Sequence, residues 1–171
     1  MPLVEPKIEK KIERFIEYTR ELDDIAVTEK KQIKKLMEVV AEKESKRRSD
    51  LEKLQTELNE YFDKALQENE EYKQKIDKFE FYATKKKAQT PRWNDYINSI
   101  LDKLNDKMRK IAEEMRDNFR EIKLKIQVRE SHVHIASFWK WIAGIGGKLW
   151  DKISKLFSDA HGLLDELLEN V

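Results

Sequence analysis

The sequence predicts an all-α fold: an antiparallel bundle of long helices, three to four rods in number, with a central αα-hairpin. Composition gives the first indication, because 40% of the 171 residues are charged and 39% are apolar, with only 4 Gly and 3 Pro. Such a composition is typical of long helices. The second indication is the spacing of apolar residues, which follows a helical period through most of the first 130 positions. Short polar stretches divide this pattern into rods.

The first rod is predicted to span residues 5–46. Its apolar residues recur at helical spacing, and Pro6 fits a first helical turn, where its missing N–H has no intrahelical acceptor anyway. Thr28 followed by Glu29 is the combination found at an N-cap and first turn. We therefore expect a short break or bend near 26–28, between the two halves of this rod.

The second rod is predicted over 49–87. Ser49 and Glu52 have the spacing of a capping box, which indicates a helix start; the alternative is an exposed turn of one uninterrupted helix. Apolar residues recur every seven positions along this rod, but Glu68 and Lys75 occupy the matching d positions. A dimeric coiled coil would bury both charges in its seam, so packing within a bundle is favoured.

The third rod is predicted over 91–129, after a basic loop that ends in Thr90 as N-cap and Pro91 at the first helical position. Rods two and three are equally long, about 58 Å each at 1.5 Å per residue, and their short connection predicts an antiparallel αα-hairpin. An eleven-residue apolar repeat runs through the third rod without a gap. Its members are Trp93, Ile97, Ile100, Leu104, Met108, Ile111, Met115, Phe119, Ile122 and Ile126.

One segment, 122–138, carries two patterns. Apolar and polar residues alternate over 122–128, and Val133 and Ile135 alternate after a polar turn, which is typical of a β-hairpin. The eleven-residue repeat includes Ile122 and Ile126 equally well. We favour the helix and retain the β-hairpin as the alternative.

The C-terminal segment, 131–171, differs from the bundle of 1–130 in composition. All 4 Gly and three of the 4 Trp lie in its last 34 residues, followed by an amphipathic run. It is interrupted by Lys140 and Lys148 and is too short to span a bilayer. We expect it to pack on the bundle as a fourth rod, or on a partner.

Partner or membrane contact is predicted for the aromatic and aliphatic residues of this segment, since Trp and Lys are favoured neighbours at a membrane interface. The segment has four lysines and five acids, so its net charge of −1 favours protein packing over a lipid surface. The predicted contact residues are Phe138, Trp139, Trp141, Ile142, Ile145, Leu149, Trp150, Ile153 and Phe157.

The tip of the predicted hairpin combines aromatic and basic residues, which can stack bases and hold phosphates. The alternative is a solvated loop above a buried aromatic cap. The overall charge of +1 argues against a protein that coats nucleic acid with its whole surface. The candidate nucleic-acid contacts are Lys85, Lys86, Lys87, Arg92 and Trp93.

Catalytic signals are weak. There is no Cys, and the three histidines, His132, His134 and His161, form no recognisable three-ligand metal set in the sequence. The single Gly cluster, 144–147, lacks the strand and spacing of a phosphate-binding loop. The sequence therefore predicts no enzyme, no cofactor and no metal site.

These patterns predict a non-enzymatic helical assembly or interaction protein that uses its C-terminal segment to bind another subunit, a partner or a membrane surface. A protein partner or homo-oligomer is favoured, a membrane surface comes next and nucleic acid last. The alternatives are a membrane-active, peripheral or pore-forming helical protein, and a nucleic-acid binder acting through the hairpin tip. The sequence has no signal-peptide or transmembrane pattern, which favours the cytoplasm.

Overall fold

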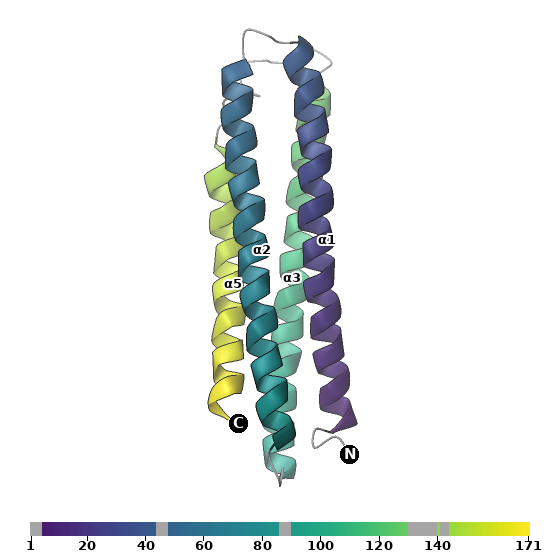
Figure 1. The fold of residues 1–171 in the computed structure, drawn as a ribbon, viewed down its shortest axis with the longest axis vertical. Coiled ribbons are helices and arrows are strands. Elements are labelled where there is room, and N and C mark those ends of the chain that lie inside the picture. Colours follow the sequence, from purple (N-terminus) through teal and green to yellow (C-terminus); the bar gives the residue numbers. More distant parts are fainter. Residues whose placement is uncertain (1–4, 44–47, 86–89, 130–139, 141–143) are drawn as a thin grey trace.

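The computed structural model describes residues 5–43, 48–85, 90–129, 140 and 144–171, and this part of the chain forms a bundle of long helices without a strand (Figure 1). Helices α1, α2 and α3 have 38, 38 and 39 residues, whereas α5 has 25. The predicted all-α bundle is confirmed. The helices are α1 (Pro6–Lys43), α2 (Arg48–Lys85), α3 (Pro91–Arg129) and α5 (Ile145–Glu169).

Helix α1 continues without interruption through Thr28, so the predicted break near 26–28 is wrong. Ile25, Ala26 and Ile33 are all buried, on both sides of the expected break. A break would turn one half of this stripe away from the core. The burial of apolar area therefore outweighs the local capping preference of a single exposed threonine.

The other helix boundaries agree with the sequence. Helix α2 begins at Arg48, so Ser49 lies within the helix and is not the N-cap of the predicted capping box, and α1 and α2 are separate helices. At the start of α3, Thr90 Oγ1 accepts a hydrogen bond from the backbone N–H of Trp93 at 3.1 Å, which confirms the N-cap. Helix α3 extends to Arg129, so 122–129 is helical; the rest of the proposed β-hairpin, 130–138, lies outside the described residues.

Side-chain contacts show that α1 and α2 are antiparallel neighbours, as are α3 and α5. The chain separation of bonded residues changes along each pair, as it must when two helices run in opposite directions. For α1 and α2 it is 33 between Lys30 and Asp63 but 50 between Thr19 and Asn69. The bundle therefore contains two antiparallel pairs.

The two pairs are joined side by side through parallel interfaces, α1 with α3 and α2 with α5. Here the separation of bonded residues stays nearly constant. Between α1 and α3 it lies from 87 to 95, and between α2 and α5 from 85 to 93. As a result, α1 begins and α5 ends at the same end of the bundle (Figure 1).

Helices α2 and α3 run antiparallel with a short connection, as predicted, but they are not direct neighbours in the described structure. They lie across the diagonal of the bundle, and α1 and α5 occupy the positions between them. Their side chains still meet in the centre, where the rings of Phe62 and Phe119 stack with centroids 4.6 Å apart. Helices that follow one another in the sequence therefore do not always pack directly against each other in this bundle.

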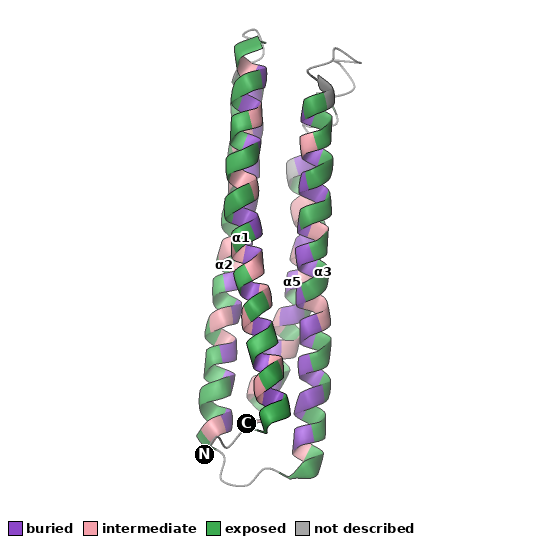
Figure 2. Cartoon of the chain, turned by 90° about the vertical axis from the view of Figure 1, so that its right-hand side faces the viewer, coloured by how far each residue is buried: buried purple, intermediate pink, exposed green. Residues whose placement is uncertain are grey.

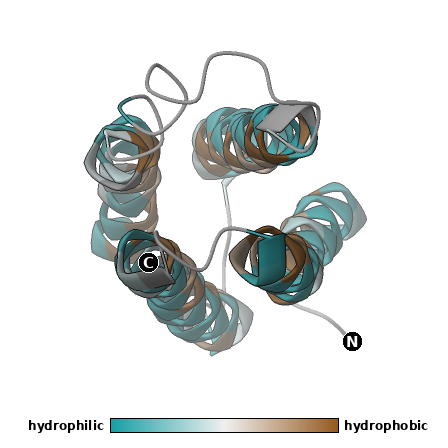
Figure 3. Cartoon of the chain, turned by 90° about the horizontal axis from the view of Figure 1, so that it is seen from above, coloured by the Kyte–Doolittle hydropathy of each residue, from teal (hydrophilic) through white to brown (hydrophobic). Residues whose placement is uncertain are grey.

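The core follows the apolar stripes of all the described helices. Buried residues recur at intervals along the helices (Figure 2), and hydrophobic residues gather on the sides that face the bundle axis (Figure 3). The eleven-residue repeat of α3 is confirmed as a core stripe, because every member after Trp93 is buried, and Trp93 packs partly against the core. The sequence pattern therefore identified the buried face of α3 correctly.

Candidate interaction site

Helix α5 packs against α2 and α3 through one apolar face. The spacing of this face is the i, i+3, i+4, i+7 pattern of an amphipathic helix. Leu149 and Trp150 are half-buried at its edge and contact the same core. The buried residues of this face are Ile145, Ile153, Phe157, Ala160, Leu164 and Leu167.

The predicted partner contacts divide into three groups. Ile145, Ile153 and Phe157 lie in the protein's own core, with exposed fractions of 7%, 0% and 1%. Leu149 and Trp150 remain partly accessible. Phe138, Trp139, Trp141 and Ile142 lie outside the described residues. In this conformation the described part of the segment is therefore a helix of the bundle, and a partner reaches Phe157 only if α5 leaves its place.

A network of aromatic rings joins α5 to α2. Trp150 lies edge-on to Tyr61 with centroids 6.0 Å apart, and Lys64 Nζ lies 5.7 Å from the Trp150 ring. Further along, Tyr72 stacks on Phe157 at 5.3 Å and donates a hydrogen bond to its carbonyl oxygen. Burial, and then the nearby carboxylates of Glu68, Glu71 and Asp159, raise the pKa of Tyr72 above its usual value. Tyr72 is therefore neutral at ordinary pH and remains a hydrogen-bond donor.

Polar contacts hold the C-terminal end of α5 to α3. The indole N–H of Trp93 donates to the carbonyl oxygen of Asn170 at 2.7 Å, and the Tyr96 hydroxyl donates to Glu166 at 2.7 Å. The hydrogen bond to Glu166 is the main cause that raises the pKa of Tyr96. These contacts lie largely at the surface, so solvent competes with each of them.

The predicted contacts at the hairpin tip differ from one another in exposure. Lys85 and Arg92 are exposed, as a nucleic-acid contact requires, and Lys86 and Lys87 lie outside the described residues. Trp93 is half-buried and bonded to Asn170, so its ring is engaged within the bundle.

Two other rings at the tip are exposed. Phe81 and Tyr82 have exposed fractions of 53% and 52% and form an edge-to-face pair with centroids 5.5 Å apart. Lys85 Nζ lies 3.8 Å from the centroid of the Phe81 ring. Phe81 and Tyr82 fall off the seven-residue stripe of α2, a signal that predicts their exposure.

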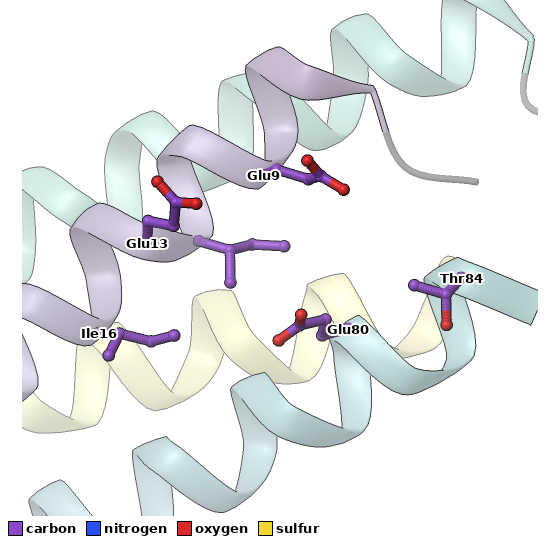
Figure 4. Close-up of a pocket in the computed structure, with 6 residues that line it drawn as sticks. Glu9, Glu13, Ile16, Glu80 and Thr84 are labelled. Atoms are coloured by element: carbon purple, nitrogen blue, oxygen red, sulfur yellow. The ribbon is translucent and has the colours of Figure 1, made fainter. Parts of the chain in front are cut away.

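A shallow groove between α1 and α2 has a cavity of about 250 Å³ (Figure 4). Its walls carry three carboxylates, Glu9 and Glu13 from α1 and Glu80 from α2, around the apolar side chains of Ile12 and Ile16. The residues that line this groove include no histidine. Thr84, at its edge, is the one hydroxyl side chain among them, so the described lining contains no histidine–hydroxyl pair of the kind that activates a nucleophile.

One cluster that sequence reasoning missed lies where α2 meets α5. His161 Nε2 is 2.6 Å from Glu68 Oε2 and 3.8 Å from Glu71 Oε2. Glu68 and Glu71 are three residues apart on one helical face, which the sequence shows, but His161 is 93 positions after Glu68. No spacing motif connects residues so far apart, so the packing of α5 on α2 was needed to find this set.

No family model, curated protein or solved structure matches this chain in the comparisons with known proteins. Among the described helices, none is both long enough and apolar enough to cross a membrane. Fold and surface therefore describe the molecule as a bundle of long helices whose C-terminal helix is amphipathic.

Proposed function

We propose that this protein is a non-enzymatic helical interaction protein in which α5, with the residues before it, is the binding element. In this proposal α5 exchanges its place in the bundle for an equivalent place on a second copy or on a partner protein. The observation that supports it best is the contrast among the helices, since α5 is the shortest and the most apolar of those described.

The apolar face of α5 has the geometry of helix-in-groove recognition. Its anchors Ile153, Phe157, Ala160 and Leu164 follow the spacing by which an amphipathic helix binds a hydrophobic groove. The groove is formed by α2 and α3. A surface that accepts α5 within one chain also accepts the same helix from another copy, which is the basis of domain swapping.

The start of α5 favours such an exchange. Gly144 is the N-cap and supplies no side-chain hydrogen bond to the free N–H groups of the first turn. Glycine also has more backbone freedom than other residues, which lowers the cost of a changed direction at this point. The start of α5 at Gly144 therefore resists a rearrangement less than a start held by a capping side chain would.

A second candidate function, binding of single-stranded nucleic acid at the tip, is favoured by one observation. Phe81 and Tyr82 are exposed beside Lys85, which is the combination of stacking surface and positive charge that such proteins use. Replacing Phe81 and Tyr82 with Ser should abolish retention on single-stranded DNA if this function is real. A wild-type protein that shows no salt-sensitive retention would exclude it.

The main proposal is tested by fixing α5 in place. The chain has no Cys, so Lys75→Cys with Asp165→Cys introduces the only two thiols, at positions whose side chains are paired at 2.7 Å between α2 and α5. A short bis-maleimide then links the two helices. We expect the unlinked protein to form oligomers in light scattering, and the linked protein to remain monomeric.

A matched control links two helices that the proposal leaves together. Lys30→Cys with Asp63→Cys joins α1 to α2 at another ion pair, with 3.1 Å between Nζ and Oδ1. This link should not change association. If linking α5 changes nothing, or if the unlinked protein is strictly monomeric, the exchange of α5 between copies is wrong; association with liposomes alone would instead support the membrane-active alternative.

A further inference from the structure

We propose that Glu68, Glu71 and His161 form a binding site for a divalent transition-metal ion of the zinc class, which would bridge α2 and α5. The ligand atoms of the three side chains lie within 4.8 Å of one another. An imidazole nitrogen and carboxylate oxygens are ligand types that Zn²⁺ accepts. With three protein ligands, a fourth position would be open to water.

The distances in the cluster are close to those of a tetrahedral site. When metal–ligand bonds are about 2.0–2.1 Å, neighbouring ligand atoms are roughly 3.3 Å apart. His161 Nε2 lies 2.6 Å from one carboxylate oxygen and 3.8 Å from the other, values on either side of this spacing. The Glu68 and Glu71 oxygens lie within 4.8 Å of each other, so every pair of ligand atoms is within about 1.5 Å of the tetrahedral spacing.

The imidazole is held by its surroundings. The ring of Tyr72 lies against the ring of His161, with centroids 4.1 Å apart. Tyr72 is itself fixed, because its hydroxyl donates to the carbonyl oxygen of Phe157 on α5. A ligand whose orientation is fixed before binding loses less conformational entropy when the ion arrives.

The local charge also favours a cation. Glu68 and Glu71 lie beside His161, and Asp159 lies two residues before it on α5. Lys107 Nζ lies 3.3 Å from Asp159 Oδ2, so Lys107 offsets the charge of Asp159. The Asp159 side chain is about half-exposed, so solvent also weakens its influence. The remaining two carboxylates make this part of the α2–α5 interface negative.

One feature limits the affinity. His161 Nδ1 is buried without a hydrogen-bond partner in the described structure. When a metal binds Nε2, the proton of a neutral imidazole resides on Nδ1, and metal-bound histidines usually donate it to an acceptor. The absence of that acceptor should weaken binding by about tenfold to a hundredfold compared with a fully supported site.

The test is calorimetric titration of Zn²⁺ into the full chain, together with thermal unfolding. We expect one ion per chain and a melting temperature that rises with Zn²⁺ concentration. His161→Gln and Glu71→Gln should each weaken binding roughly tenfold or more. Glu71 has a half-exposed side chain, with 53% of its surface accessible, so Glu71→Gln should fold normally even if His161→Gln does not.

The matched control removes the other two of the 3 histidines, as His132→Gln with His134→Gln, and should bind Zn²⁺ like the wild type. The proposal is overturned if the wild type takes up no Zn²⁺, or if Glu71→Gln and His161→Gln bind as tightly as the wild type. Binding that is lost only in the control variant would place the metal elsewhere. This inference does not require α5 to exchange, so either proposal can fail alone.

Discussion

The two parallel interfaces of the bundle, α1–α3 and α2–α5, have the same geometry but contain different kinds of buried side chain. Between α1 and α3, asparagines are buried: Asn94 and Asn105 are each 6% exposed, and their amide groups donate to Glu5 and to the carbonyl oxygen of Lys11. Between α2 and α5, aromatic rings fill the same role, with Tyr72 stacked on Phe157. We name α1–α3 the polar interface and α2–α5 the aromatic interface after these buried side chains, although the Lys75–Asp165 and Glu68–His161 pairs also join α2 to α5.

This difference matters for specificity. A buried amide must be placed opposite its acceptor, so sliding α1 along α3 would leave polar groups unpaired at a cost of about 1–3 kcal/mol each. Aromatic surfaces carry less positional information, because ring contacts tolerate a range of distances and angles. We therefore expect the buried amides to fix the register of α1 on α3 more strictly than the ring contacts fix the register of α5 on α2.

The largest effect that would test this contrast is expected at Phe157. Phe157→Ala removes a ring that is 1% exposed and stacked on Tyr72, so we expect the free energy of unfolding to fall by about 3–5 kcal/mol in chemical denaturation. Phe81→Ala is the matched control, because the same ring is 53% exposed there and its loss should cost under about 0.5 kcal/mol. Equal effects of the two substitutions would contradict the packing of α5.

Alkaline pH should weaken the aromatic interface next. Burial is the main cause that raises the pKa values of Tyr61 and Tyr72 in the folded protein, whereas unfolded tyrosines titrate near pH 10. Above about pH 10 the unfolded chain releases protons that the folded chain keeps, so stability is present below pH 10 and is lost as pH rises. Each tyrosine contributes about 1.4 kcal/mol per pH unit.

Denaturation curves between pH 9 and pH 11.5 would measure this loss. A variant with Tyr61→Phe and Tyr72→Phe should lose stability less steeply over this range, by up to two protons in the slope. An unchanged slope would mean that these hydroxyls are accessible to solvent in the folded protein.

A smaller effect is expected at the polar interface. Asn105→Ala removes the hydrogen bond from Nδ2 to the carbonyl oxygen of Lys11, which is 3.2 Å long and partly buried. We expect a loss of about 1 kcal/mol in the free energy of unfolding. The loss is small because the Lys11 carbonyl also belongs to a helix, and because Oδ1 of Asn105 already has no hydrogen-bond partner among the described residues. A variant more stable than the wild type would show that the amide does not contribute to register.

The smallest effect has the opposite sign. The Tyr61 hydroxyl is buried and has no hydrogen-bond partner among the described residues, so Tyr61→Phe removes an unsatisfied polar group and should stabilise the bundle by up to about 1 kcal/mol at neutral pH. Tyr72→Phe is the comparison, since its hydroxyl does have an acceptor and its loss should destabilise. If both variants change thermal stability in the same direction, the hydrogen bond of Tyr72 has little value.

The sequence was sufficient for the fold class and for the buried face of α3, because an unbroken eleven-residue repeat leaves one face to bury. It failed at Thr28, where a local cap signal was overruled by core residues on both sides. The predicted hairpin of 49–87 and 91–129 implied that α2 and α3 pack side by side, whereas they lie across the diagonal of the bundle. An amphipathic stripe tells which face of a helix is covered but not which helix covers it.

The candidate sites were less predictable than the fold for a related reason. Aromatic and basic residues near the tip were visible in the sequence, but only the packing showed that Trp93 is engaged while Phe81 is exposed. The Glu68 and His161 pair depends on a contact between residues 93 positions apart. The Trp-rich segment is evident from composition, whereas the cluster of Glu68, Glu71 and His161 has no spacing pattern that the sequence alone could show.

The diagonal placement of α2 and α3 has a consequence for how fast the chain folds. In a bundle whose consecutive helices are all neighbours, most contacts join residues close in the sequence. Here the α1–α3 and α2–α5 interfaces join residues 85 to 95 positions apart, so loops of that size must close before these contacts form. Folding rates fall as contacts become less local. We therefore expect this bundle to fold more slowly than one of equal length with neighbouring hairpins, with the antiparallel pairs forming before they dock.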